Sequence, residues 1–172
     1  MLLSLAVILV PLVIITALFT DLPDEKPVEE VDWKPVLAVA REQSPYPVLA
    51  PTNLPSGWRA TRATWVKVGE PHLNGEPSVR NLWLLGFLSP DDTYVSLGQG
   101  DQQIEDFIAE QTRQGAVDGE STVGGQSWQR RVSPDGRTRS LVRQEPQVTT
   151  VVSGDVDYAA LETYASTLSS EG

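Results

Sequence analysis

The chain has 172 residues and is acidic, with 23 Asp and Glu against 13 Lys and Arg and a formal net charge of −10. This charge argues against binding to nucleic acid, because phosphates require a basic surface, and against close docking on an anionic lipid surface. The chain has no cysteine, which excludes disulfides, thiolate catalysis and metal sites with sulfur ligands.

The N-terminus is strongly apolar. Residues 1–20 carry no charged side chain, whereas residues 21–32 are rich in Asp, Glu and Pro. At about 1.5 Å per residue, a helix over residues 1–20 spans roughly 30 Å, which matches the thickness of the hydrocarbon core of a bilayer. We therefore predict a transmembrane anchor at 1–20, an extended acidic stalk at 21–32 and an α+β domain at 33–172. A cleaved signal peptide is the alternative, and it fits less well because the apolar run is too long and a suitable cleavage site is missing.

The charges beside this segment predict its orientation. Lys and Arg next to a membrane span normally stay in the cytoplasm. None precedes the span, and Lys26 is the only basic residue of the stalk. We therefore expect a single-pass protein of the cell membrane, with a cytoplasmic N-terminus and an extracytoplasmic domain. The missing basic leader also suggests a natural start upstream of Met1.

The first half of the domain combines a helix with three strands. Val36, Val39 and Ala40 recur at helical spacing, which predicts a helix over 34–43 with Asp32 as its cap. Prolines at 47, 51 and 55 favour an extended segment over 46–58 and exclude a central strand there. Alternation and turn residues predict strands at 58–68, 81–88 and 93–99, separated by an exposed loop at 69–80 and a turn at 89–92. The strand at 81–88 is apolar on both faces, so we expect it at the centre of the sheet.

A helix, three strands and a final helix follow in the second half. A helix over 101–115 is predicted from the stripe Ile104, Phe107 and Ile108, with Asp101 as its cap. Strands are predicted at 126–132, 137–143 and 147–153, and a final helix at 155–169. Both halves read strand, strand, strand, helix, so an internal duplication is one interpretation. The elements together predict an α+β fold, with helices packed on a mostly antiparallel sheet.

Four segments resemble a known family: residues 46–61 (YPVLAPTNLPSGWRAT), 82–100 (LWLLGFLSPDDTYVSLGQG), 124–128 (GGQSW) and 161–168 (LETYASTL). The chain resembles actinobacterial single-pass membrane proteins that are catalogued only as domain-of-unknown-function family number 4245. This resemblance implies an anchored envelope domain and brings no activity or site with it. The LPSGW turn and the terminal ASTL are more distantly similar to ectodomains of some bacterial anti-sigma factors, which implies sensing or partner binding.

The sequence contains no catalytic or metal-binding motif that we can defend. His72 is the only histidine and lies in a loop rich in Gly and Pro, without the second ligand of a histidine metal site or a G-x-S-x-G serine. The Gly98-Gln99-Gly100 segment lacks the third glycine of a dinucleotide fingerprint. The carboxylate pairs at 91–92 and 105–106 are typical of a turn and of a solvated helix face. We therefore expect no catalytic residue, no metal and no cofactor.

The tryptophans and arginines are the remaining clues. Trp58 and Trp65 lie seven residues apart in one strand, which places them on opposite faces unless a bulge intervenes. An exposed tryptophan beside Arg59 or Arg62 would suit a glycan, a peptide or another envelope protein. Simple packing of both rings is the alternative. Five arginines lie between 130 and 143. One interpretation is that they lie on solvated faces and pair with acidic residues; the other is that they form an anion-binding strip.

These observations lead to one main hypothesis, a non-enzymatic, membrane-anchored envelope protein whose outer domain binds a ligand or partner. The candidate binding residues are Trp58, Trp65, Arg59 and Arg62. The alternatives are a hydrolase that uses carboxylates and a carrier with an apolar cavity.

Overall fold

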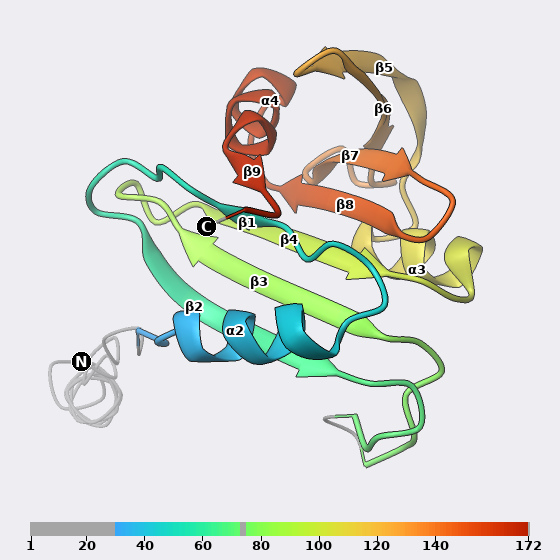
Figure 1. The fold of residues 1–172 in the computed structure, drawn as a ribbon. Coiled ribbons are helices and arrows are strands. Elements are labelled where there is room, and N and C mark those ends of the chain that lie inside the picture. Colours follow the sequence, from blue (N-terminus) through green and yellow to red (C-terminus); the bar gives the residue numbers. More distant parts are fainter. Residues whose placement is uncertain (1–29, 73–74, 172) are drawn as a thin grey trace, which may run out of the picture.

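The computed structural model describes residues 30–72 and 75–171, so the predicted anchor at 1–20 and most of the stalk lie outside the described residues. None of the helices in the described part is long and apolar enough to cross a bilayer. The centre of the fold is a seven-stranded antiparallel sheet with the order β2-β3-β4-β8-β7-β6-β5, and helices cover both of its faces (Figure 1). The predicted α+β class is therefore confirmed.

The helices are α2 (Lys34–Gln43), α3 (Ile104–Gln111) and α4 (Tyr158–Ser166). The strands of the large sheet are β2 (Arg59–Val66), β3 (Leu82–Leu88), β4 (Tyr94–Gly100), β5 (Ala116–Val123), β6 (Gln126–Val132), β7 (Arg139–Gln144) and β8 (Thr149–Gly154). A separate two-stranded sheet joins β1 (Ala50–Pro51) to β9 (Leu168–Ser169).

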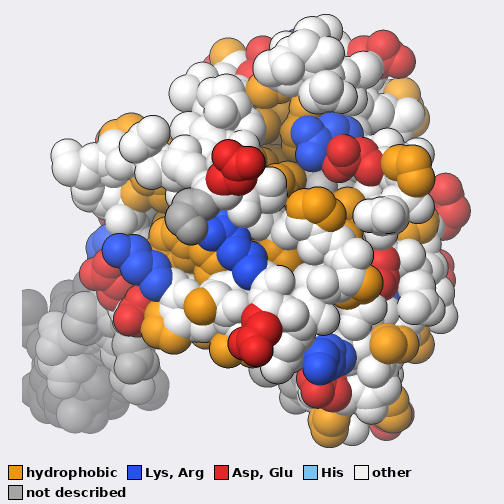
Figure 2. Space-filling view, viewed as in Figure 1, with side chains coloured by type: hydrophobic (Ala, Val, Ile, Leu, Met, Phe, Trp, Pro, Cys, Tyr) orange, Lys and Arg blue, Asp and Glu red, His pale blue; other side chains and the backbone are white. Residues whose placement is uncertain are grey.

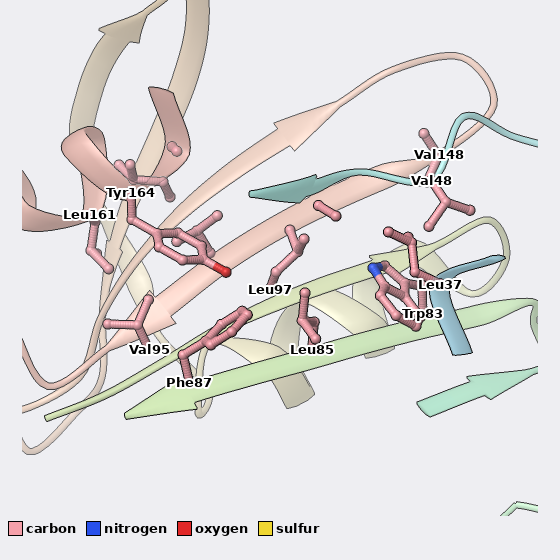
Figure 3. Packing of buried hydrophobic residues seen from close by; sticks show 14 of the residues in the cluster. Leu37, Val48, Trp83, Leu85, Phe87, Val95, Leu97, Val148, Leu161 and Tyr164 are labelled. Carbon is pink, nitrogen blue, oxygen red and sulfur yellow. The ribbon is translucent and has the colours of Figure 1, made fainter. Parts of the chain in front are cut away.

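The main hydrophobic core lies between the sheet and helices α2 and α4. Trp83, Leu85 and Phe87 occupy alternate positions of β3 and project to this side, where they meet Leu97 of β4 and Tyr164 of α4 (Figure 3). Trp83 and Leu97 are completely buried. Burial of each large apolar side chain contributes roughly 1.5–3 kcal/mol, so this layer is the main source of the domain's stability.

A buried glutamine attaches the proline-rich segment to this core. Gln99 is fully buried, and its amide accepts a hydrogen bond from the Leu49 backbone at 2.8 Å and donates to the Pro47 carbonyl at 3.2 Å. Trp83 donates its indole N–H to the Leu49 carbonyl at 3.0 Å. The segment therefore runs extended over the sheet, as the prolines predict, and its polar backbone groups are satisfied.

The opposite face of the sheet has a smaller core under α3. Phe107 and Ile108 of this helix are buried against Leu84 of β3, Val142 of β7 and Val151 of β8. The predicted stripe of α3 is therefore confirmed, but the helix is shorter than predicted. Asp101 does not cap it: its carboxylate accepts two hydrogen bonds from Asn81, at 2.9 and 2.6 Å.

Several other expectations need correction. The central strand is β8 and not β3, because β4 and β8 join the two halves of the sheet. Val39 is 44% exposed, and Leu37 and Ala40 form the buried side of α2.

The predicted internal duplication does not hold, since the second half contains a fourth strand, β5, and helices α3 and α4 pack on opposite faces of the sheet. Strand β5 is not predicted because most of its residues are exposed and its sequence lacks a regular alternation of apolar and polar residues.

Figure 2 shows the side of the molecule that carries α2. Acidic and basic side chains are scattered over this side and do not form a patch of one sign. Hydrophobic atoms are visible beside α2, where a shallow depression of about 420 Å³ lies between this helix and β1. The more polar depression described below lies on the opposite face of the sheet.

Candidate functional site

Helix α3 has only eight residues and leaves part of its sheet face uncovered. Next to it, strand register aligns Gly86 of β3 with Ser96 of β4, Ser96 with Ser153 of β8, and Ser153 with Ser140 of β7. We call these four residues the small-residue row. Because none of the four has a large side chain, the surface of the sheet is recessed here relative to its surroundings, and a depression forms beside the end of α3.

This depression, the α3-face hollow, has a volume of about 490 Å³, within the range of small-molecule sites. Ser96 and Ser153 lie in its floor, and their hydroxyl oxygens are 2.9 Å apart and hydrogen-bonded. The ionisable and aromatic residues that line it are Arg62, Asp92, Tyr94, Glu110, Arg113 and Asp155. The lining is thus mainly polar, unlike that of an apolar carrier.

Tyr94 lies across the floor of the hollow. A Cβ atom on Gly86 would lie 2.2 Å from the Tyr94 hydroxyl oxygen, so the ring can occupy this place only because residue 86 has no side chain. The ring is 38% exposed. The hollow therefore combines hydroxyl groups from two strands with an accessible aromatic ring.

The carboxylates of the hollow have partners within the described chain. Asp92 pairs with Arg59 at 2.6 Å, Glu110 lies 3.7 Å from the buried Arg80, and Asp155 accepts a hydrogen bond of 2.6 Å from the Thr138 hydroxyl. Two of the three negative charges are thus matched by a cation, and the third is satisfied by a hydroxyl.

The arginines of the hollow have no such partner. Among the described residues, neither Arg62 nor Arg113 forms an ion pair. Burial raises the pKa of the Tyr94 hydroxyl above its ordinary value, while the positive charges of these two arginines oppose that rise. The charges of both guanidinium groups therefore act on the Tyr94 hydroxyl, which lines the same hollow.

The backbone at the rim is unusual. Arg113 and Gln114 follow α3 with φ values of 53° and 59°, and Asp92 has φ 54°. A helix commonly ends with one left-handed residue, usually glycine, and two consecutive non-glycine residues in this conformation are costly. The second of them closes the helix, since its N–H donates to the Ala109 carbonyl at 2.7 Å. This strained end of α3 places Arg113 at the hollow.

The predicted binding residues do not form one site. A bulge at Thr61 shifts the register of β2 between Ala60 and Arg62, and it brings Trp58 and Trp65 to the same face, packed against the main core. Trp58 stacks on Tyr164 at 5.9 Å. The opposite-face arrangement is therefore wrong, and both rings are partly buried.

Arg59 and Arg62 lie on the other face of β2. Arg62 lines the α3-face hollow, and Arg59 holds Asp92 at its rim. Of the four predicted residues, these two contribute to the hollow, whereas the tryptophans lie on the far side of the sheet. Sequence reasoning missed Tyr94, Arg113, Ser96 and Ser153, because only strand register and the end of α3 bring them together.

The arginines between 130 and 143 mostly have structural partners. Arg130 donates from Nε to the Ser121 hydroxyl at 2.6 Å and pairs with Glu162 of α4 at 2.8 Å, and Ser121 also donates to this carboxylate at 2.6 Å. This network lowers the pKa of Glu162, through the Ser121 hydrogen bond first and Arg130 second. It attaches α4 to the curved β5–β6 hairpin (Figure 1).

Three of the other four arginines of this group also contact neighbouring groups. Arg143 pairs with Glu145 at 2.9 Å and lies over the Trp128 ring, and Arg131 donates to the Gly115 carbonyl at 3.0 Å. Arg139 lies 5.9 Å from the centre of the Tyr158 ring. Packing and pairing with other groups therefore account for most of the cluster, and the anion-binding strip is not supported.

Within residues 30–72 and 75–171, no group of three or more His, Asp or Glu residues could hold a metal ion. His72 lies away from the α3-face hollow, in a separate depression of about 330 Å³ that it shares with Arg80.

Comparison with known proteins identifies the family of this chain. The model of a family described as a protein of unknown function, DUF4245, matches residues 1–168. The chain belongs to the DUF4245 family. The family match covers both the apolar N-terminus and nearly the whole α+β domain, so DUF4245 describes the two together. No curated protein and no solved structure gives a significant match.

Proposed function

We propose that this chain is a single-pass, membrane-anchored protein of the cell envelope, and that its extracytoplasmic domain is a non-enzymatic module that binds a small polar ligand. The apolar residues 1–20 and the acidic residues 21–32 support the anchor and the orientation. The α3-face hollow supports the binding role and is the observation that carries this proposal.

Binding fits the hollow better than hydrolysis does. A carboxylate hydrolase needs one carboxylic acid and one carboxylate that both face the substrate and are free to move protons. The carboxylates of Asp92 and Asp155 are instead held by Arg59 and Thr138, at 2.6 Å each. Unpaired guanidinium groups beside hydroxyl groups are typical of recognition sites, where they fix the orientation of a ligand.

The location is tested by protease shaving of intact cells that express the chain with a tag after Gly172. We expect the tag to be lost while a cytoplasmic control protein survives. The matched control is the same chain without residues 1–20, which lacks the predicted anchor, should stay in the cytoplasm and should keep its tag until the cells are lysed. A protected tag on the full chain would contradict the proposed orientation and with it the envelope role.

A further inference from the structure

The charges of the α3-face hollow are separated along the small-residue row. Arg62 of β2, Arg113 after α3 and Tyr94 all line the hollow, and the charges of both arginines act on the Tyr94 hydroxyl. Asp155 follows β8, which is three strands away from β2 in the sheet. One end of the hollow is therefore cationic, and the other end offers a hydrogen-bond acceptor.

Resting on the proposed function, we infer that the hollow binds a small molecule that carries a carboxylate or phosphate at the Arg62 and Arg113 end and hydrogen-bond donors at the Asp155 end. Guanidinium groups donate several N–H bonds in a plane that matches the oxygens of a carboxylate or phosphate. The Tyr94 hydroxyl lies beside them and can donate to the same oxyanion. A donor at the far end of the ligand would satisfy the remaining oxygen atom of Asp155, Oδ2.

The geometry favours this ligand over a neutral one. Both arginines line the hollow, and among the described residues neither forms an ion pair, although each would gain from one. The left-handed backbone at Arg113 and Gln114 maintains this arrangement at a cost in conformational energy. An oxyanion bound by these guanidinium groups would supply the negative charge that they lack, whereas a neutral ligand would not.

The test uses the full chain in a non-ionic detergent with its tyrosines replaced by 3-fluorotyrosine. The chain has four tyrosines, and Tyr94 is the one that lines the hollow; the Tyr94→Phe variant assigns its fluorine resonance. The probes are glycerol 3-phosphate, glycerate and glycerol, which share hydroxyl groups and differ in their oxyanion. We expect both anions, but not glycerol, to shift the Tyr94 resonance in a saturable way.

Variants then test the roles of the charged groups. Arg62→Gln and Arg113→Gln should each weaken binding of both anions by about tenfold or more, the usual range for a lost charged hydrogen bond. Lys34→Gln removes the same charge from the exposed start of α2, on the other side of the sheet, and should leave binding unchanged. Asp155→Asn should weaken glycerol 3-phosphate more than inorganic phosphate.

Contrary results separate the two proposals. If glycerol shifts the resonance as strongly as the anions do, the hollow binds ligands but the inferred charge selectivity is wrong, while the proposed function stands. Equal effects of Lys34→Gln and Arg62→Gln would show that only net charge matters and would overturn the inferred site. If none of the three probes moves the Tyr94 resonance, the inference is also overturned, and the shaving experiment still tests the location independently.

Discussion

The glycines around the α3-face hollow give a pair of substitutions with different expected costs. In Gly86→Ala, the new Cβ would lie 2.2 Å from the Tyr94 hydroxyl oxygen, which is the far end of a partly exposed side chain. In Gly154→Ala, the new Cβ would lie 2.8 Å from the Tyr94 carbonyl oxygen, which belongs to the backbone of the neighbouring strand. A side chain can swing away, whereas the backbone can move only if β4 and β8 separate.

The expected energies follow from this difference. Neither glycine has a positive φ, so alanine itself is allowed at both positions and gains about 0.4–1 kcal/mol by restricting the unfolded chain. Overpacking against a fixed atom costs roughly 1–3 kcal/mol. We therefore expect Gly154→Ala to lower the free energy of unfolding by about 1–2 kcal/mol, and Gly86→Ala to change it by less than about 1 kcal/mol while it displaces the Tyr94 ring.

Urea unfolding of the full chain, followed by tryptophan fluorescence, measures both free energies. The Tyr94 fluorine resonance reports the displacement of the ring, and it should move in Gly86→Ala. A larger loss of stability in Gly86→Ala than in Gly154→Ala, or an unchanged Tyr94 resonance in Gly86→Ala, would refute the placement of Tyr94 over residue 86.

Three further predictions concern the core and the ionisable groups. Trp83→Ala removes a fully buried ring and should lower the free energy of unfolding by about 3–5 kcal/mol, whereas Trp65→Ala should cost clearly less because this ring is only partly buried. Equal losses in urea unfolding would contradict the partial exposure of Trp65. The lowered pKa of Glu162 means that its stabilising effect is complete when the pH is above the ordinary pKa of glutamate and is lost as the pH falls below roughly 4. In Glu162→Gln, the free energy of unfolding should therefore fall less steeply with acid than in the parent chain. Burial, followed by the hydrogen bond to Asp118, raises the pKa of Tyr158 to about 12, so the stabilising effect of Tyr158 is complete below about pH 10 and is lost as the pH rises toward 12. An absorbance titration of Asp118→Asn should show a lower pKa for this tyrosine. An unchanged pKa would mean that the 2.7 Å contact between these side chains does not form in solution.

The sequence predicts local elements well where hydrophobic periodicity and turn residues agree. Helix α2 was expected at 34–43 and occurs at Lys34–Gln43. The start of α3 was not predictable, since Asp101 binds the distant Asn81 and does not cap the helix. Strand β5 has no apolar alternation, because one of its edges is free and only its last residues reach the core.

The α3-face hollow depends on contacts that local patterns do not encode. The small-residue row combines residues from four strands, and their alignment follows from strand register and from the pairing of β4 with β8. Ser96 and Ser153 are ordinary residues in their own segments. The two tryptophans were informative as large side chains, but the bulge at Thr61 decides their face, and a bulge of this kind has no clear signature in this segment.

The measurement that tests the central claim most directly is labelling of a single cysteine in the hollow. The chain has no cysteine of its own, so Arg113→Cys introduces the one thiol, at an exposed position of the rim. We expect a membrane-impermeant maleimide to label this thiol in intact cells as fully as in lysed cells. Labelling only after lysis would contradict the claim that the hollow opens outside the cytoplasmic membrane.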